Sequence, residues 1–245
     1  MSDFLLIHGS CHGAWCWRDV IPHLQAAGHR ARAIDLPSHG ADPTPISDVT
    51  LDLYARAILA AIETPVTLVG HSMAGYPISA AAETAPDRIA RLVYLCAYAP
   101  KDGLSLAEMR RAGPGQPLRD AIRVAPDRQS FTFDPALTDD RLYHDCPPEA
   151  RAFAATRLGP QPILPQEQPI TLTDRYRSVP RHYIRCLQDR AIPPDYQQTM
   201  TEGWPEGTVS TLDASHSPFF ACPETLAKRL IAVAANPLSC APARG

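Results

Sequence analysis

The sequence has no long hydrophobic run and no marked excess of charge of either sign. Its opening apolar run, Phe4–Ile7, is far shorter than the ~20 residues of a membrane-spanning helix, and it is too short for a secretory signal. A net charge of -3 over 245 residues gives no electrostatic reason to expect binding to nucleic acid or to an anionic membrane surface. We therefore expect neither a membrane nor a nucleic acid as a partner.

The cysteines form no regular pattern. They are odd in number and scattered, and no secretory signal precedes them. Such spacing does not indicate a disulfide framework, so we expect reduced thiols and a cytoplasmic location. The seven cysteines are Cys11, Cys16, Cys96, Cys146, Cys186, Cys222 and Cys240.

A metal-binding motif is also missing. The spacing of His8 and His12 resembles that of two zinc ligands on a helix. No acidic residue separates them, however, and the segment is a glycine-containing loop. We expect no metal ion and no organic cofactor.

What the sequence does contain is an alternation of strand-like and helix-like segments. With 45% hydrophobic residues, the chain can bury the core of one large α/β domain. Short apolar runs without polar alternation are typical of strands covered on both faces, and their alternation with helices predicts a mostly parallel sheet. Strands are expected at 4–7, 32–36, 66–69, 89–96, 182–187 and 208–212, and a closing helix at 223–235.

The pattern changes after Pro100. From there to about residue 180 the chain is rich in proline, arginine and short helical pieces, with one small strand predicted at Phe131–Phe133 and helices at 139–144 and 148–158. Because this segment has little apolar content of its own, we expect a lid inserted between sheet strands. The predicted organisation is a core of residues 1–100 and 181–236, a lid of residues 101–180 and a flexible tail of residues 237–245.

The stretch that carries the chemistry is Val66–Gly75. An apolar strand runs into Gly-X-Ser-X-Gly around Ser72, and small residues that suit a helix follow. This strand–turn–helix context is typical of a nucleophile elbow, in which the serine Oγ stands at the end of the sheet. Gly70 and Gly75 allow the sharp turn to close because they have no side chains. We predict that Ser72 is a nucleophile.

A serine nucleophile needs a base and an acid that orients the base. His216 follows the last predicted strand, in a polar loop from which its imidazole could reach Ser72. For the acid we predict Asp189, because it follows the strand at 182–187 and stands at the carboxyl end of the sheet. Asp102, after an earlier strand, is the alternative by topology, and Asp195 and Asp213 are less suited.

The reaction also needs backbone donors for the charge that develops on a carbonyl oxygen. One should be the N–H of Met73, directly after the nucleophile. The other should come from the loop after the first strand, where Ser10 is the candidate and Gly9 keeps the approach open.

Several of these segments resemble the plant methylesterase and hydroxynitrile lyase family of α/β-hydrolases. The resemblance implies an α/β-hydrolase fold, the triad Ser72, Asp189 and His216, and backbone donors at Ser10 and Met73. It also implies an apolar pocket under the lid, to which we assign Gly9, His71, Phe131, Tyr143 and Ser217. The matching segments are Leu6–Trp17, Gly28-His29, Ala33–Leu36, Gly70–Gly75, Leu142–Glu149 and Asp189–Pro193.

Three departures distinguish this chain from the lyases of that family. Those enzymes have a threonine in place of Gly9, a glutamate in place of His71 and a lysine in place of Ser217, and the hydroxyl and ammonium groups handle the cyanohydrin. Without them, a nucleophile, a base and an oxyanion hole remain, which suits an esterase.

We therefore predict a serine carboxylesterase acting on small esters, such as aromatic or methyl esters. Carbon–carbon lyase chemistry and a small-ligand receptor with weak turnover are the alternatives. The sequence leaves both a monomer and a homodimer open.

Overall fold

A six-stranded sheet forms the centre of the molecule. The computed structural model describes residues 1–236, and the predicted tail at 237–245 lies outside the described residues. The strand order is β2-β1-β3-β4-β8-β9, and every neighbouring pair in this sheet is parallel. The strands are β1 (Asp3–Ile7), β2 (Arg30–Ile34), β3 (Val66–His71), β4 (Ile89–Leu95), β8 (Arg181–Cys186) and β9 (Val209–Leu212).

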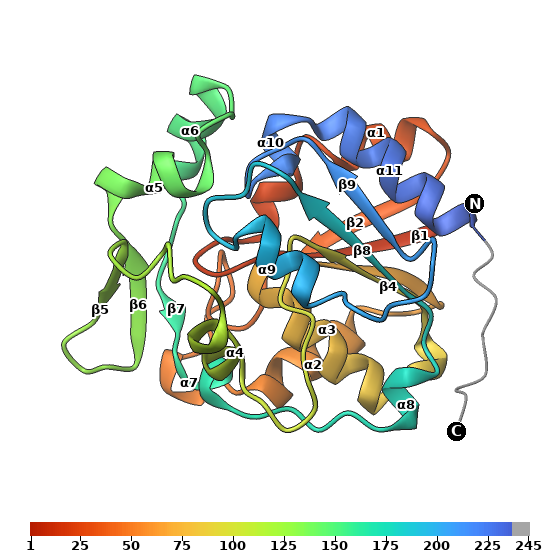
Figure 1. Ribbon diagram of the computed structural model, residues 1–245, viewed down its shortest axis with the longest axis horizontal. Helices are drawn as coiled ribbons and strands as arrows, with labels where there is room; N and C mark the ends of the chain where they lie inside the picture. The colour runs from red at the N-terminus through yellow and green to blue at the C-terminus, as the bar shows by residue number, and fades with distance from the viewer. Residues whose placement is uncertain (237–245) are drawn as a thin grey trace.

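Helices cover both faces of this sheet (Figure 1). Alternate side chains of a strand point to opposite faces, and β1 shows the consequence: Leu5 and Ile7 belong to one buried cluster, whereas Phe4 and Leu6 belong to the other. The two clusters explain why Phe4–Ile7 is continuously apolar. One face carries α2 (Leu51–Ala60) and α3 (Gly75–Thr84), and the other carries α1 (Ile21–Ala26), α10 (Pro218–Ala221) and α11 (Pro223–Ala235).

Local signals set several helix ends. Thr50 caps α2, since its Oγ1 accepts a hydrogen bond from the Leu53 N–H at 3.0 Å. After α1, Gly28 has a φ of 83°, which glycine adopts without strain. A 3₁₀ turn precedes α1, and Pro22 lies within the first turn of α1. The 3₁₀ segments are η1 (Ala14–Trp17), η2 (Ile46–Asp48), η3 (Ser72–Ala74) and η4 (Pro86–Arg88).

A second, smaller sheet lies in the segment between β4 and β8. It is antiparallel, with the order β5-β6-β7, and Figure 1 shows it beside α5 and α6, away from the main sheet. The strand expected at Phe131–Phe133 is its central strand. The elements here are α4 (Leu106–Ala112), β5 (Ile122–Val124), β6 (Ser130–Phe133), α5 (Pro135–Leu142), α6 (Pro148–Ala155), β7 (Gln161–Pro162) and α7 (Leu164–Glu167).

The end of the inserted segment returns to the main sheet. Helix α8 (Asp174–Arg177) packs against α3, and the Thr173 N–H and hydroxyl both bond to the Glu83 carboxylate. After β8 a short helix that the sequence did not predict, α9 (Pro194–Thr199), precedes β9. Within residues 1–236, no helix has both the length and the apolar character needed to cross a membrane.

Candidate active site

Ser72 stands at a strained turn between β3 and α3. Its φ is 56°, in the left-handed region that residues with a side chain rarely adopt. The turn closes only because its glycines lack side chains: a Cβ at Gly75 would lie 2.0 Å from the carbonyl oxygen of Tyr98, and one at Gly70 would lie 2.9 Å from that of Ala74. This is the geometry of a nucleophile elbow, and it directs Ser72 into a cavity.

His216 connects Ser72 to Asp189. It lies in the loop after β9 and is almost completely buried. Its Nε2 is 3.0 Å from the Ser72 Oγ, and its Nδ1 is 2.8 Å from the Asp189 Oδ2. Because a carboxylate only accepts, Nδ1 carries the proton, which leaves Nε2 free to accept from the serine hydroxyl.

The Asp189 carboxylate is held by four donors. Its Oδ1 accepts from the N–H groups of Ala191 and Ile192 at 2.7 and 2.9 Å, and its Oδ2 also accepts from the Gln197 Nε2 at 2.9 Å. These bonds fix the direction of the carboxylate.

The other aspartates considered from the sequence lie in different places. Asp102 accepts from the Leu172 N–H and Asp213 accepts from the Gln188 side chain, and both are exposed. Asp195 lies in the first turn of α9 and is also exposed. Of these four residues, only Asp189 contacts His216.

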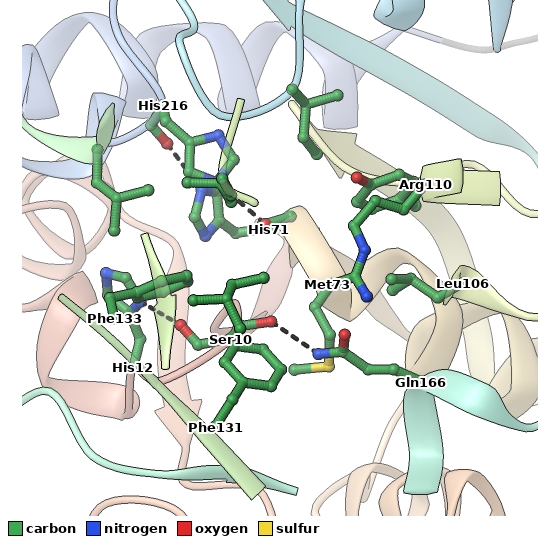
Figure 2. A pocket seen from close by; sticks show the side chains of 16 residues that line it. Ser10, His12, His71, Met73, Leu106, Arg110, Phe131, Phe133, Gln166 and His216 are labelled. Carbon is green, nitrogen blue, oxygen red and sulfur yellow. Dashed lines mark hydrogen bonds between the residues drawn. The ribbon is translucent and has the colours of Figure 1, made fainter. Parts of the chain in front are cut away.

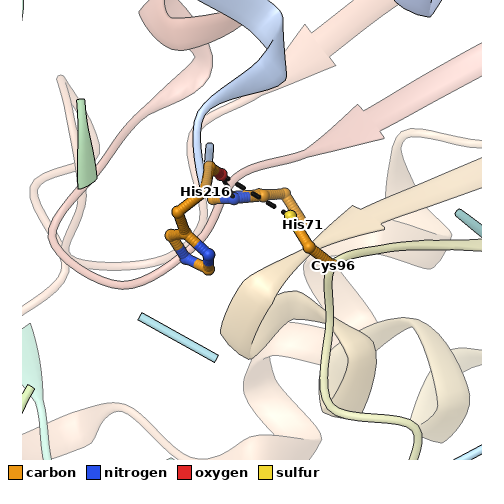
Figure 3. Close-up of side chains that lie close together, drawn as sticks. All are labelled: His71, Cys96 and His216. Atoms are coloured by element: carbon orange, nitrogen blue, oxygen red, sulfur yellow. Dashed lines mark hydrogen bonds between the residues drawn. The ribbon is translucent and has the colours of Figure 1, made fainter. Parts of the chain in front are cut away.

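The backbone of His216 is held as well as its ring. Figure 3 shows His71 and Cys96 beside it, with the His71 Nε2 donating to the His216 carbonyl oxygen at 2.8 Å and the Cys96 thiol to the same oxygen at 3.5 Å. Burial lowers the pKa of His71 well below its usual value, so this imidazole is neutral. The two imidazole rings are 4.6 Å apart.

The same three residues bring potential metal ligands together. Among the described residues, atoms of His71, Cys96 and His216 lie within 4.8 Å of one another. Both ring nitrogens of His216 already bond to Asp189 and Ser72, and burial raises the pKa of the Cys96 thiol, which disfavours the thiolate that binds a metal. These three side chains are therefore better suited to the hydrogen bonds that they make than to binding a metal ion.

Ser10 lines the same cavity as Ser72 and His216. Its carbonyl oxygen accepts from the His12 Nδ1 at 2.7 Å, and its hydroxyl accepts from the Gln166 Nε2 at 2.9 Å. Within residues 1–236, no acceptor bonds to the Ser10 N–H. Met73 lines the same cavity at the first turn after Ser72, where amides have no intrahelical acceptor.

His12 links Ser10 to the inserted segment. Burial lowers its pKa to about 4, so it is neutral at pH 7. With the proton on Nδ1 for Ser10, its Nε2 accepts from the Tyr143 hydroxyl at 2.6 Å. Tyr143 is thereby fully buried against His12.

The cavity itself is walled mainly by apolar side chains. Figure 2 shows it from close by, with Phe131, Phe133 and Leu106 on its walls and His216 at its edge. The polar side chains that reach it from the inserted segment are Arg110 and Gln166. The apolar lining residues are Met73, Tyr98, Leu106, Leu118, Ile122, Phe131, Phe133, Leu142 and Ile192.

Of the five residues assigned to the pocket from the sequence, the structure places two on its wall. His71 and Phe131 line the cavity, whereas Tyr143 does not, because its hydroxyl turns to His12. Gly9 presents no side chain and packs directly against His71 and Ser72. Ser217 is completely buried where α10 begins.

Sequence reasoning missed Arg110 and Gln166 as cavity residues and Gln197 as a partner of Asp189. Arg110 and Gln166 lie on helices of only seven and four residues, so no periodic pattern marks which side chains face inward. Gln197 lies on α9, which was not predicted.

Comparisons with known proteins agree with this geometry. Residues 4–229 match the model of the alpha/beta hydrolase family. The chain belongs to the α/β-hydrolase family, which confirms the fold class predicted from the sequence.

Within that family the chain is similar to methylesterases. It is 32% identical to Methylesterase 7 of Arabidopsis thaliana over 250 residues, covering 95% of this chain and 96% of the relative. It is 31% identical to Esterase PIR7B of Oryza sativa subsp. japonica over 257 residues, covering 95% and 96%. These relatives confirm the resemblance seen in the sequence.

Solved structures show the same likeness. A pyrethroid hydrolase from Sphingobium faniae superposes with a TM-score of 0.85 at 30% identity, covering 96% of this chain and 98% of the other. A polyneuridine aldehyde esterase superposes with a TM-score of 0.83 at 25% identity, covering 95% and 99%.

Proposed function

We propose that this protein is a serine carboxylesterase in which Ser72, His216 and Asp189 act as the catalytic triad. The observation that carries the proposal is the continuous hydrogen-bonded chain from the Ser72 Oγ through His216 to Asp189, at the wall of an apolar cavity. The esterase names of the relatives support the same class of reaction.

In the proposed reaction, Ser72 attacks the ester carbonyl while His216 Nε2 takes its proton. Asp189 holds the imidazole in the required tautomer and stabilises the imidazolium that forms. His216 then protonates the leaving alkoxide, which leaves an acyl group on Ser72. Water, deprotonated by the same imidazole, attacks the acyl group and releases the carboxylic acid.

The developing oxyanion would bind the N–H groups of Ser10 and Met73. Two contacts support Ser10 in this role, because the His12 bond to its carbonyl oxygen and the Gln166 bond to its hydroxyl hold this residue in place. A donor fixed before the reaction needs no reorientation when the charge appears.

Small carboxylic esters, methyl and aromatic esters among them, are the proposed substrates. The apolar walls and the methylesterase names of the relatives support this class. The proposed steps use side chains, backbone N–H groups and water. A cytoplasmic location stays a prediction, in keeping with the six described cysteines, which form no disulfide with one another.

The surroundings of Gly9 favour hydrolysis over cyanohydrin cleavage. A Cβ at Gly9 would lie 2.7 Å from the His71 Nδ1 and 2.9 Å from the Ser72 Cβ, so His71 occupies the space that a threonine would need. Departing cyanide also needs a positive charge beside His216, and the neutral Ser217 at that position supplies none. We expect the protein to hydrolyse small aryl or methyl esters and to release almost no cyanide from mandelonitrile above the buffer blank.

The test is covalent labelling with a serine-directed phosphonate. We expect peptide mapping to find the phosphonate on Ser72, Ser72→Ala to abolish both labelling and ester turnover, and the exposed Ser47→Ala control to keep both. Labelling of another serine, or near-normal turnover by Ser72→Ala, would refute the triad.

A further inference from the structure

Among the described residues that line the site cavity, Arg110 is the only arginine, lysine, aspartate or glutamate. It extends from α4 past Leu106 toward Met73 (Figure 2). Its side chain is partly buried, and no residue within 1–236 forms a hydrogen bond or ion pair with its guanidinium group. An arginine stays protonated at any ordinary pH, so a full positive charge stands at the cavity without a protein counter-ion.

A second hollow adjoins the cavity at Arg110. It has a volume of about 200 Å³ and shares Tyr98, Arg110, Leu118 and Ile122 with the site cavity. Arg119 also lines it, and within the part of the chain that the structure describes no aspartate or glutamate lines either hollow. Arg110 therefore stands where the two hollows meet, in surroundings that hold positive charge only.

The other titratable groups at the cavity do not compensate this charge. Burial lowers the pKa of His12 to about 4 and that of His71 well below its usual value, so both imidazoles are neutral. Burial raises the pKa of the Tyr98 phenol, and the nearby charge of Arg110 only partly opposes that rise, so the phenol stays protonated. A partly desolvated charge without a partner is unfavourable, and an anionic ligand would relieve that cost.

We propose that the substrate is an ester that carries a second, anionic group, a carboxylate, which binds the Arg110 guanidinium between the cavity and the hollow. This inference rests on the proposed function and names its substrate class. The apolar walls would contact the stretch between the two groups, while Ser72 reacts at the ester. Hydrolysis by one water breaks only the ester bond and releases the alcohol and a second carboxylate, so the group on Arg110 is unchanged.

The guanidinium is suited to this task because its planar set of N–H donors matches the two oxygens of a carboxylate. A charge-assisted hydrogen bond of this kind corresponds to a preference of about ten- to hundredfold over a neutral group. The preference should weaken at high ionic strength, because the site is open to solvent through the outer hollow.

The experiment compares matched esters with and without the charge. In the first set, the monomethyl esters of succinate, glutarate, adipate and pimelate are each compared with the corresponding dimethyl ester, so the carboxylate lies on the acyl part. In the second set, 4-acetoxybenzoate is compared with its methyl ester, and here the carboxylate lies on the leaving group. We expect wild-type kcat/KM per ester group to favour the charged member about ten- to hundredfold in at least one set. Arg110→Gln should lower that ratio by the same factor, mainly through KM, and Arg110→Lys should keep part of it.

Arg111→Gln is the matched control, because Arg111 is exposed on the same helix and lines neither hollow. It should keep the wild-type ratio, and thermal unfolding should show that all variants are folded. Equal or lower kcat/KM for the charged esters in both sets, or an unchanged ratio in Arg110→Gln, would overturn the proposal while leaving the esterase function standing.

If wild type hydrolyses no ester, the proposed function fails and the anion site is judged by calorimetry with the adipate dianion. Adipate binding that Arg110→Gln abolishes and Arg111→Gln retains would uphold the anion site. No binding to wild type, or equal binding to all variants, would refute it.

Discussion

The proposed reacting groups and the walls of the cavity come from two different parts of the molecule. Ser72, Asp189 and His216 lie on loops after β3, β8 and β9, where parallel strands of one rigid sheet end together. Most of the wall comes from short elements inserted between β4 and β8. Backbone hydrogen bonds between parallel strands position the loops of the sheet, whereas the inserted elements join the core through buried side chains such as Phe131, Phe133 and Tyr143. Changes in the first part should therefore destroy the reaction, and changes in the second should alter its rate or its substrate.

The largest effect should follow from a change at the sheet. We expect Asp189→Asn to lower kcat/KM for an aryl ester by about 10³- to 10⁴-fold, because an amide would favour the wrong tautomer of His216. The exposed Asp195→Asn and Asp102→Asn variants should stay within about threefold of wild type. Comparison of the three kcat/KM values tests the assignment, and a severe loss in Asp102→Asn would place the acid after β4 instead.

A second change tests how closely the Ser10 loop approaches the elbow. Gly9→Ala would place a Cβ 2.7 Å from the His71 Nδ1. We expect the free energy of unfolding to fall by about 1 to 3 kcal/mol. Because the new Cβ would also press on Ser72, the proposed nucleophile, we expect kcat to fall by a larger relative amount. In the Gly159→Ala control, no atom lies within 4 Å of the new Cβ, so both quantities should stay near wild type. Normal kcat in Gly9→Ala would show that this close approach does not matter.

A contact between the two parts should have a smaller effect. Tyr143→Phe removes the hydroxyl that donates to the His12 Nε2 and leaves that nitrogen buried without its donor. We expect the free energy of unfolding to fall by about 1 to 3 kcal/mol. We also expect a several-fold lower kcat, because His12 holds Ser10 through its carbonyl oxygen. Tyr176→Phe is the control, since it removes a hydroxyl bonded to Tyr94 on the far side of the sheet. Equal kcat in both variants would remove Tyr143 from the support of the oxyanion site.

The last prediction concerns pH, and it acts on stability rather than on the reaction. The His12 pKa is about 4 in the folded protein and close to 6.5 when unfolded. Below pH 6.5 the unfolded chain binds a proton that the folded chain does not, so the free energy of unfolding should decrease as the pH falls toward 4, and this contribution should level off below 4. Urea unfolding of wild type and His12→Asn between pH 4 and 7.5 should show a flatter profile for the variant. Identical slopes would mean that His12 does not contribute.

The same contrast explains what could be predicted from the sequence. The strands at Phe4–Ile7 and Val66–Val69 were predicted because a strand covered on both faces is mostly apolar, as these parts of β1 and β3 are. Ser72 could be found from the glycines around it, and His216 and Asp189 from their positions after strands. The structure then places these three residues within hydrogen-bond distance of one another.

The inserted segment gave much weaker signals. Strands β5 and β7 have three and two residues, too few for an alternating pattern, and only β6 was predicted. Which way Tyr143 turns depends on His12, a residue 131 positions away. Arg110 and Gln166 become cavity residues only through the packing of short helices. Contacts of this kind are decided by tertiary structure, and local sequence does not encode them.

Trapping of the acyl group during turnover tests the proposed mechanism most directly. The protein is mixed with an excess of an activated aryl ester, quenched with acid within milliseconds to seconds, and mapped by mass spectrometry. We predict a burst of the aryl alcohol that matches the enzyme concentration, with an acyl group on Ser72, and neither signal in Ser72→Ala. Steady turnover by wild type without an acyl adduct, or an adduct on a different residue, would contradict a Ser72 acyl-enzyme.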